Sequence, residues 1–346
     1  MTKVHRQLLK RLDAVNAVSL DTAYGFQANV PQMTEKILEY FATSLRLDIK
    51  PLHFTSYEDA SEVQRAAFRQ DVRAANYVFA GPGSPSYAVH QWAPLGIEED
   101  FRGTLAAGGV LCFASAAALT LGSLTVPVYE IYKVGAKAHW LKGLDVLSTA
   151  GIRGAVIPHY DNAEGGNYDT RYCYLGEERL VELERQLPVD TGILGVDEHT
   201  AGIIDLESQT LSVLGKGGVY WRRNGSTRTF TSGSTIDLAE IQSFTPEPTS
   251  TPPKLSTDED GLDTLIELAR QGGPQAIDAI ASLARRATSG GVGYIDPSDL
   301  LTGLLALRLK ARNEKNFAVA DEIRNLINAC GFEVMDSADG STWTPK

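Results

Sequence analysis

Cysteine is scarce in this sequence: Cys112, Cys173 and Cys330 are the three in a chain of 346 residues. They lie too far apart to predict a disulfide framework or the short ligand spacings of a zinc site. Apolar runs are short as well, since none approaches the roughly 18 residues that cross a membrane. The basic segment Met1 to Leu12 is not followed by the apolar stretch of a signal peptide, so we expect a cytoplasmic protein without a membrane partner.

Positive charge is in the minority, with 32 Lys and Arg against 43 Asp and Glu and a net charge of −11. This balance disfavours non-specific binding to phosphate backbones. A hydrophobic content of 43% and a charged content of 22% are ordinary for a globular protein. The length exceeds one average domain and predicts two, with no internal repeat. We expect neither a metal nor another cofactor.

Strand-like and helix-like segments alternate in the first part of the chain. The expected strands are 15–20, 47–54, 77–80 and 110–114, and the expected helices are 32–45 and 61–73. This βαβα rhythm predicts an α/β domain with a parallel sheet covered by helices on both faces. Functional sites of such sheets form at the carboxyl ends of the strands. Gly81 to Pro85 and the turn at Ser115 both lie at such ends.

The pattern then changes to short strands separated by turn signals. We expect strands at 126–133, 155–158, 192–196, 202–206, 211–214 and 218–222, a helix at 177–186, and exposed strands within 225–237. Residues 244–261 contain four prolines among Ser, Thr and acidic residues, which predicts an extended linker. Helical composition follows at 262–269, 276–287, 296–311 and 317–329, and a small hairpin is expected from 333–335 and 342–343. The predicted domains are therefore 1–243 and 262–346.

One stretch, Gly108 to Gly122, carries the strongest chemical signal. A short apolar strand ends at Ser115 and is followed at once by residues that favour a helix. A strand that turns at a serine into a helix is the geometry of a nucleophile elbow, which lifts the hydroxyl clear of the sheet. The N–H groups of a first helical turn have no partner within the helix. Ser115 is thus a candidate nucleophile and the Ala116 N–H a candidate oxyanion donor, whereas a small residue at a tight junction is the alternative.

Five segments occur in an order that indicates a known family. They are Asp21 to Phe26, Gly81 to Ser84, Phe113 to Ala118, Ile157 to Asn162 and Gly195 to Ala201. They resemble, respectively, an early strand-end loop, a glycine-rich oxyanion loop, a Gly-x-Ser-Ala-Gly-Ala elbow, a Pro-His-Tyr segment and a Gly-(Ile/Leu)-Asp-Glu-x-Thr-Ala strand. Together they resemble the serine hydrolases of the dipeptidase E and cyanophycinase family. The resemblance implies a class I glutamine amidotransferase-like fold, a three-layer sandwich with a mostly parallel central sheet.

The same resemblance implies roles for individual residues. Ser115 is the expected nucleophile, His159 its general base, and Glu130 the third member of a Ser-His-Glu triad, as the acid within 126–132. A base is needed because a serine hydroxyl is a weak nucleophile, and a carboxylate fixes the imidazole tautomer. Gly83 is the expected second oxyanion donor, since Pro82 has no N–H. For each side chain a structural role, such as holding a loop, is the alternative.

Two residues depart from the family's elbow, which has glycine two positions before and two after the serine. Phe113 and Ala117 stand there, and Phe113 is expected to reshape the elbow or obstruct the pocket. Other polar residues are candidates for substrate binding, and Arg171 has the fork geometry for a substrate carboxylate, with a surface salt bridge as the alternative. The substrate-binding candidates are Ser84, Asn162, Glu164, Arg171, Glu198 and His199.

A second resemblance covers about 40 residues near the C-terminus, Leu307 to Arg324, Gly331 to Ser337 and Gly340 to Trp343. These segments resemble the C-terminal domain of cysteinyl-tRNA synthetase, which contacts the tRNA anticodon. The chain lacks the catalytic motifs of that enzyme, so we do not expect it to charge tRNA. Its basic side chains form either a nucleic-acid-binding strip or an ordinary solvated face.

Two functions from different classes are consistent with these observations. The first is a serine peptidase or amidohydrolase that cleaves a small peptide or amide through an acyl-enzyme, and the resemblance implies acidic or aspartyl peptides. The second is a non-catalytic pocket protein, favoured by Phe113, whose C-terminal domain docks tRNA or a protein. Hydrolysis linked to tRNA is a third reading. The sequence leaves the oligomeric state open, a homodimer included.

Overall fold

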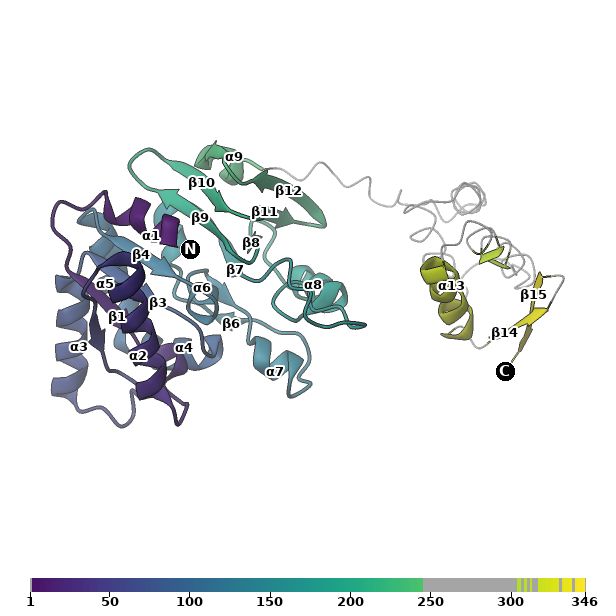
Figure 1. Ribbon diagram of the computed structural model, residues 1–346, viewed down its shortest axis with the longest axis horizontal. Helices are drawn as coiled ribbons and strands as arrows, with labels where there is room; N and C mark the ends of the chain where they lie inside the picture. Colours follow the sequence, from purple (N-terminus) through teal and green to yellow (C-terminus); the bar gives the residue numbers. More distant parts are fainter. Residues whose placement is uncertain are drawn as a thin grey trace. The chain divides into compact units, whose positions relative to one another are not determined.

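The computed structural model describes residues 2–244 and, further along, 304–305, 308–309, 312, 317–329, 332–337 and 340–345 (Figure 1). The chain divides into two compact units, Met1–Thr249 and Ser250–Lys346. The expected linker at 244–261 lies outside the described residues except for Phe244, as do the expected helices at 262–269 and 276–287 and most of 296–311. Within the described ranges, no helix combines the length and the apolar composition that crossing a membrane requires.

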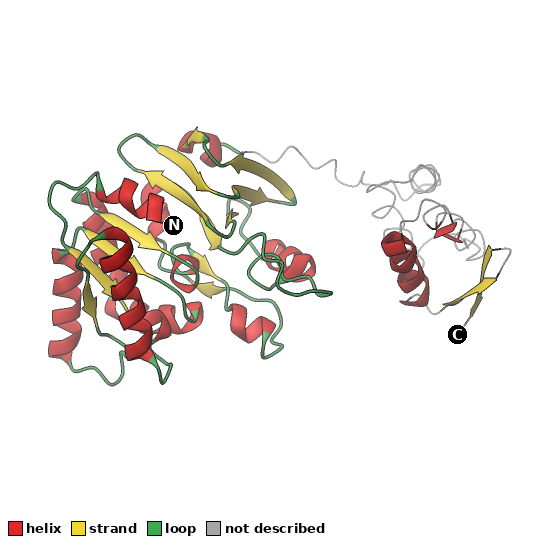
Figure 2. Cartoon of the chain, in the orientation of Figure 1, coloured by secondary structure: helices red, strands yellow, loops and turns green. Residues whose placement is uncertain are grey.

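Helices and strands alternate along the first unit as far as residue 185, and six strands then follow one another (Figure 2). Its strands are β1 (Ala17–Leu20), β2 (Lys50–Leu52), β3 (Tyr77–Ala80), β4 (Val110–Phe113), β5 (Leu124–Thr125), β6 (Leu141–Lys142), β7 (Gly154–Ile157), β8 (Gly192–Val196), β9 (Thr200–Asp205), β10 (Thr210–Gly215), β11 (Gly218–Arg223), β12 (Ser226–Thr231) and β13 (Thr235–Asp237). Its α-helices are α1 (Thr2–Leu9), α2 (Val30–Tyr40), α3 (Glu62–Ala74), α4 (Pro85–Trp92), α5 (Ile97–Ala106), α6 (Ala116–Leu119), α7 (Val128–Tyr132), α8 (Gly176–Arg185) and α9 (Leu238–Gln242). Shorter helical turns are η1 (Thr22–Tyr24), η2 (Phe41–Leu45), η3 (Ala93–Leu95) and η4 (Val146–Ala150).

Parallel pairing dominates the centre of this unit. Four parallel strands form one sheet in the order β2-β1-β3-β4. A six-stranded sheet has the order β12-β11-β8-β7-β5-β6, in which β5, β7 and β8 are parallel and the outer strands antiparallel. An antiparallel sheet, β13-β10-β9, completes the unit. The expected α/β architecture with a mostly parallel central sheet is therefore confirmed.

Helices cover both faces of the four-stranded sheet, as β3 shows. Val78 and Ala80 belong to an apolar cluster that includes α3, α4 and α5, whereas Tyr77 packs with α1 and η2 on the other face. Successive side chains of a strand point to opposite faces, so an apolar strand needs cover on both sides. The result is the expected three-layer arrangement (Figure 1). Fully buried aromatic side chains such as Phe101 each contribute about 1.5–3 kcal/mol through burial.

Most expected elements are confirmed to within a few residues, and the segment 126–133 is the clear error. We expected a strand there because Val, Ile and Tyr favour strands, but the structure forms helix α7. Pro127 has no N–H to donate to a ladder and stands immediately before the helix. Val128 and Ile131, three residues apart, are buried on one side of α7, and Tyr129 is exposed. Helical spacing of the apolar residues thus outweighs their strand propensity.

Three elements are described in the second unit. The expected helix at 317–329 is α13 (Phe317–Ala329), and the expected hairpin is formed by β14 (Phe332–Ser337) and β15 (Gly340–Pro345). The two strands are antiparallel, with Val334 opposite Trp343. The local pattern therefore predicted this part of the chain correctly.

Candidate active site

Ser115 lies between β4 and α6 in a backbone conformation that few residues adopt, with φ 51° and ψ −125°. Its side chain makes no capping hydrogen bond to α6, although it occupies the N-cap position. A hydrogen bond of 3.2 Å from the Ala117 N–H to the Gly81 carbonyl holds the turn in place. Strained backbone conformations of this kind cluster at functional sites, where the surrounding structure enforces them. The strand–serine–helix geometry expected from the sequence is present, with the hydroxyl free of its own helix.

His159 lies within hydrogen-bond distance of this hydroxyl. It follows β7, and its Nε2 lies 3.0 Å from Ser115 Oγ. Its φ is 51°, and its carbonyl accepts hydrogen bonds from the N–H of Cys173 at 3.0 Å and of Asn162 at 3.3 Å. These bonds hold the histidine backbone while the ring remains about one-third exposed. The distance between the two side chains is within the reach needed for proton transfer from serine to imidazole.

The carboxylate beside His159 is Glu198, not Glu130. Glu198 Oε1 lies 2.8 Å from His159 Nδ1. Because Oε1 accepts only, Nδ1 carries the proton and Nε2 accepts from the serine hydroxyl. Glu198 is held in turn, since its N–H donates to Asp161 Oδ1 at 2.7 Å and the Asn162 amide donates to Oε1 at 3.3 Å. The place beside His159 that was expected for Glu130 is occupied by Glu198, which was expected to bind substrate.

Glu130 faces another group of side chains. It is carried by α7, and its Oε1 accepts a hydrogen bond of 2.5 Å from the Ser86 hydroxyl. Ser86 Oγ lies 2.9 Å from Ser84 Oγ. The second carboxylate oxygen, Oε2, is buried without a hydrogen-bond partner among the described residues. The helix that replaces the expected strand therefore directs this carboxylate to the start of α4 and away from the imidazole.

The two expected oxyanion donors lie on neighbouring turns. Gly83 has a φ of 143°, and a Cβ there would lie 1.9 Å from the Ala23 carbonyl oxygen, so glycine is required. Ser84 follows, donates its N–H to the same carbonyl at 2.8 Å and caps α4 through its hydroxyl. Within residues 2–244, the structure gives no acceptor for the N–H of Gly83 or of Ala116. Helix α4 packs against α6, which brings the two turns together.

Phe113 packs against the aromatic side chains beside the elbow. Its ring packs edge-to-face against Phe101, with centroids 5.2 Å apart, and lies 6.0 Å from the ring of Trp92. The side chain is partly buried and packs against the apolar cluster that contains these two rings. The expected reshaping of the elbow or obstruction of the pocket stays a prediction. Ala117 is fully buried.

The loop after His159 contains three of the substrate-binding candidates. Asn162 is buried and holds Glu198, and Glu164 accepts a hydrogen bond from the Tyr174 hydroxyl. Arg171 is already engaged: its Nε and Nη2 each donate to a different oxygen of Asp169 at 2.9 Å. This fork holds the pKa of the Asp169 carboxyl well below its usual range. The surface salt bridge, which was the alternative for Arg171, is what the structure shows.

His199 makes no hydrogen bond or ion pair with Ser115, His159 or Glu198 in the described part of the chain. It occupies an exposed turn between β8 and β9 with a φ of 54°, and its carbonyl accepts from the Lys216 N–H at 3.2 Å. Among the described residues, no set of three His, Cys, Asp or Glu side chains is arranged to hold a metal ion.

The sequence analysis did not identify the residues that hold Glu198 and the His159 backbone in place. Asp161 accepts from Glu198, and three consecutive residues, Tyr172, Cys173 and Tyr174, have φ between 57° and 68°. Consecutive non-glycine residues with left-handed backbone cost conformational free energy, so the surrounding structure must enforce them. Here the segment donates backbone hydrogen bonds to the His159 and Tyr160 carbonyls. The position of Asp161 two residues after His159 was an available signal. No local pattern predicts the left-handed run.

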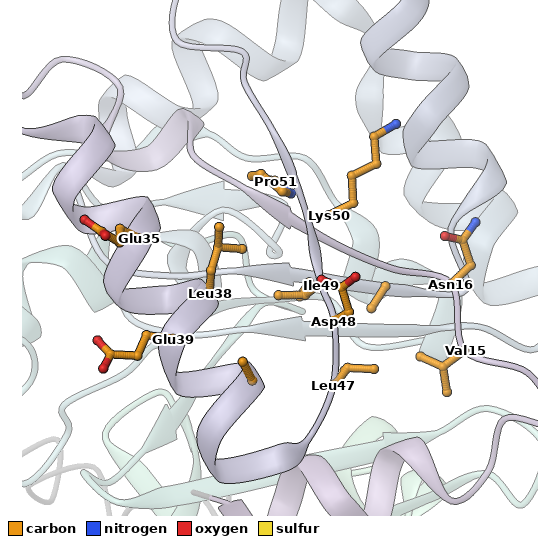
Figure 3. A pocket seen from close by; sticks show the side chains of 12 residues that line it. Val15, Asn16, Glu35, Leu38, Glu39, Leu47, Asp48, Ile49, Lys50 and Pro51 are labelled. Atoms are coloured by element: carbon orange, nitrogen blue, oxygen red, sulfur yellow. The ribbon is translucent and has the colours of Figure 1, made fainter.

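Measurable cavities lie elsewhere on the first unit. One of about 680 Å³ lies between α2 and the edge strand β2 and includes Glu35, Leu38 and Lys50 in its lining (Figure 3). Another, of about 300 Å³, is lined by Arg153, Trp221 and their neighbours. Neither cavity is lined by Ser115, His159 or Glu198.

Comparison with solved structures decides the fold. The first unit resembles the crystal structure of a peptidase from an acI-B1 Actinobacterium, with a TM-score of 0.54 and 18% sequence identity. The match covers 68% of this chain and 90% of that one. The first unit shares the fold of that structure. No model of a known protein family matches the chain.

Curated relatives match short stretches of this chain. A cysteine–tRNA ligase from Chlorobaculum tepidum is 43% identical over 49 residues, 14% of this chain and 10% of the ligase. Another from Bacteroides thetaiotaomicron is 52% identical over 40 residues, 12% of this chain and 8% of the ligase. The chain thus spans about a tenth of the length of these relatives. The length of the matches agrees with that of the C-terminal resemblance.

Proposed function

We propose that the first unit is a serine peptidase or amidohydrolase that cleaves a small peptide or amide, with Ser115, His159 and Glu198 as its triad. The observation that carries this proposal is the continuous chain of hydrogen bonds from Ser115 Oγ through the imidazole to Glu198 Oε1, of 3.0 and 2.8 Å. The peptidase fold supports the same reading. Both ring nitrogens are used, each in the role that general-base catalysis requires.

The first half of the reaction forms an acyl-enzyme. Ser115 Oγ attacks the substrate carbonyl carbon while its proton passes to His159 Nε2, and the Glu198 carboxylate stabilises the imidazolium. The N–H groups of Gly83 and Ala116 donate to the oxyanion that develops. Collapse of the tetrahedral species breaks the C–N bond, and the departing amine takes the proton from Nε2. An ester of Ser115 remains.

Water completes the cycle. It gives a proton to His159 Nε2 and its oxygen attacks the ester carbonyl, forming a second tetrahedral species. The C–O bond to Ser115 breaks, Oγ recovers the proton from Nε2, and the carboxylic acid leaves. The same three side chains and two N–H groups therefore serve both halves, with no net change in the enzyme.

Labelling with a fluorophosphonate tests this function directly. The full chain should form a stable adduct at Ser115, located by mass spectrometry, and Ser115→Ala should form none. The variant Ser212→Ala, whose hydroxyl lies on β10, is the matched control and should label like the wild type. Absence of an adduct in the folded wild type contradicts the proposal and favours the non-catalytic pocket protein.

The cysteine–tRNA ligase matches support a second proposal, that the C-terminal unit docks tRNA. Filter binding of unmodified tRNA between about 50 and 200 mM salt should show an affinity that falls with salt. Residues 1–249 alone should not bind. Equal binding with and without the C-terminal unit contradicts this role, and salt-independent retention of a protein partner favours protein docking.

A further inference from the structure

Asp197 is a buried carboxylate that stands directly before Glu198, at the point where the chain leaves β8. Its Oδ2 accepts hydrogen bonds from the Gly218 N–H at 2.7 Å and from the Tyr220 hydroxyl at 2.9 Å. Its own N–H donates to the Gly218 carbonyl at 3.1 Å. These three bonds tie the end of β8 to β11, so they determine the direction in which the next residue, Glu198, leaves the sheet.

The Tyr220 hydroxyl supplies one of the two hydrogen bonds on this carboxylate. Asp197 is 6% exposed, and its other oxygen, Oδ1, is buried without a hydrogen-bond partner among the described residues. Burial raises the pKa of Asp197, and the bonds from Gly218 and Tyr220 oppose that rise. Because a buried charge with a single hydrogen bond is costly, removal of the hydroxyl forces the carboxylate to shift or to take up a proton.

The ring of Tyr220 contacts the segment that carries the histidine. It stacks on the ring of Tyr160, the residue after His159, with centroids 4.8 Å apart and an interplanar angle of 25°. Gly195 lies opposite Tyr220 in the pairing of β8 with β11, and a Cβ there would be 2.5 Å from Tyr160 Cδ2. Glycine at this position therefore leaves the space that the Tyr160 ring fills beside Tyr220.

A single side chain thus contacts the neighbours of both His159 and Glu198. The hydrogen bond of 2.8 Å between these two side chains depends on a fixed spacing of the two segments that carry them. Within the described part of the chain, neither Tyr220 nor Asp197 has a hydrogen bond or ion pair with a residue of the proposed triad. Any effect of Tyr220 on the reaction therefore passes through its neighbours.

We propose that Tyr220 is a positioning residue of the hydrolase. Its hydroxyl orients Glu198 through Asp197, and its ring orients His159 through Tyr160. This inference rests on the proposed serine hydrolase function, and it adds a side chain on which the rate depends although that side chain touches no reacting atom. The competing explanation is a contact that stabilises the sheet without affecting the rate.

Tyr220→Phe in the full chain removes the hydroxyl and keeps the stacked ring. The maximal rate of fluorophosphonate labelling at Ser115 should fall about tenfold, because small displacements of catalytic groups slow the chemical step. The probe concentration that gives half of the maximal rate should stay within about twofold, since positioning does not change binding. Tyr220→Leu, which removes the ring as well, should label about threefold more slowly than Tyr220→Phe.

Tyr77→Phe is the matched control. The Tyr77 hydroxyl is also buried and lies 2.6 Å from His5 Nδ1. Tyr77 pairs with Val110, the first residue of β4, at the end of that strand away from Ser115. Loss of this hydroxyl should leave the maximal labelling rate within about twofold of the wild type, because Tyr77 has no contact with the segments that carry the triad.

A double variant separates positioning from general stability. In Glu198→Gln the acid that Tyr220 positions is already absent, so adding Tyr220→Phe should lower the rate by less than about twofold. Asp197 gives an independent measurement. Asp197→Ala should lose about tenfold or more, whereas Asp197→Asn, which keeps an oxygen acceptor for both donors, should stay within about threefold of the wild type. Circular dichroism establishes that each variant is folded, and the two Asp197 variants decide the outcome if Tyr220→Phe does not fold.

The two proposals fail in different ways. An unlabelled wild type contradicts the hydrolase function, and this inference with it. With a labelled wild type, three results contradict the positioning role alone: Tyr220→Phe labels within about twofold of the wild type, its loss is equally large in the Glu198→Gln background, or Asp197→Asn labels as slowly as Asp197→Ala. Equal rates for Tyr220→Leu and Tyr220→Phe contradict the part assigned to the ring.

Discussion

At position 83, the carbonyl oxygen of Ala23 leaves no space for a side chain. The alanine Cβ of Gly83→Ala would lie 1.9 Å from that oxygen, in backbone with a φ of 143°. The oxyanion loop must therefore shift or strain, and we expect a loss of stability of about 2–4 kcal/mol. Urea denaturation measures this loss, and fluorophosphonate labelling of the folded fraction should slow at least tenfold. Gly103→Ala, in α5 with open space around it, is the control, and unchanged labelling of Gly83→Ala would remove this glycine from the oxyanion site.

Glu198 can be tested by a change of a single atom. In Glu198→Gln the amide keeps the shape but loses the charge that stabilises an imidazolium, and it can present a donor to His159 Nδ1. We expect the labelling rate of Ser115 to fall about 100-fold, within the range that general-base catalysis supplies. Stopped-flow or gel-based labelling measures this rate, with Glu39→Gln as the charge-matched control. A rate within twofold of the wild type would show that Glu198 only holds the loop.

The sequence predicted the roles of some of these side chains and not of others, and the contacts of the individual residues explain the difference. Ser115 was recognised from the strand–serine–helix pattern at a strand end, and His159 was assigned through the resemblance to a known family. Glu198 was expected among the substrate ligands, and no sequence spacing links it to His159, from which 39 residues separate it. Its direction depends on the turn that ends β8, where Asp161 accepts the Glu198 N–H. Contacts of this kind are tertiary and leave no local pattern.

Among the elements, α1 is attached to the core through a histidine. His5 Nδ1 lies 2.6 Å from the Tyr77 hydroxyl and 3.7 Å from Cys112 Sγ, and its ring packs edge-on against Tyr40. Burial lowers the pKa of His5 from 6.5 to about 4, because the charged ring is poorly solvated there. The helix is therefore bound by a neutral imidazole among uncharged partners.

This burial makes the stability of the first unit depend on pH. Between pH 6.5 and about 4 the unfolded chain binds a proton at His5 that the folded chain does not, so stability falls as the pH falls through this window. The loss approaches about 3 kcal/mol below pH 4. Urea midpoints measured from pH 7.5 to 4 should show it, and His5→Gln, which keeps a polar group but does not titrate, should give a flatter profile. An equal slope in both proteins would contradict the assignment to His5.

Helix α7 shows where element prediction from the sequence fails. Its five residues are too few for a periodicity to be recognised, and Val, Ile and Tyr favour strands. The longer helix α13 and the strands β3 and β8 were predicted with their observed bounds, because each has a complete apolar pattern between clear breaks. Glu130 was expected beside His159 because the family resemblance implied an acid within 126–132, whereas the structure places its carboxylate against Ser86.

At the scale of the whole chain, every residue of the proposed active site lies within the first compact unit. Residues 1–249 should therefore fold alone and label at Ser115 with a rate within about twofold of the full chain. Urea denaturation followed by circular dichroism should give a single cooperative transition for this fragment. Failure of the isolated fragment to fold or to label would show that the C-terminal unit completes the hydrolase.

The hydrogen bond from the Cys173 N–H to the His159 carbonyl joins the two ends of a loop. Within this loop, Arg171 donates a hydrogen bond to Asp169. Asp161 and Asn162 lie in this loop and hold Glu198, so substitutions there would disturb the carboxylate beside the imidazole. Residues 163–170 make none of these contacts, and exchanging them should change the loop while His159 and Glu198 keep their hydrogen bond.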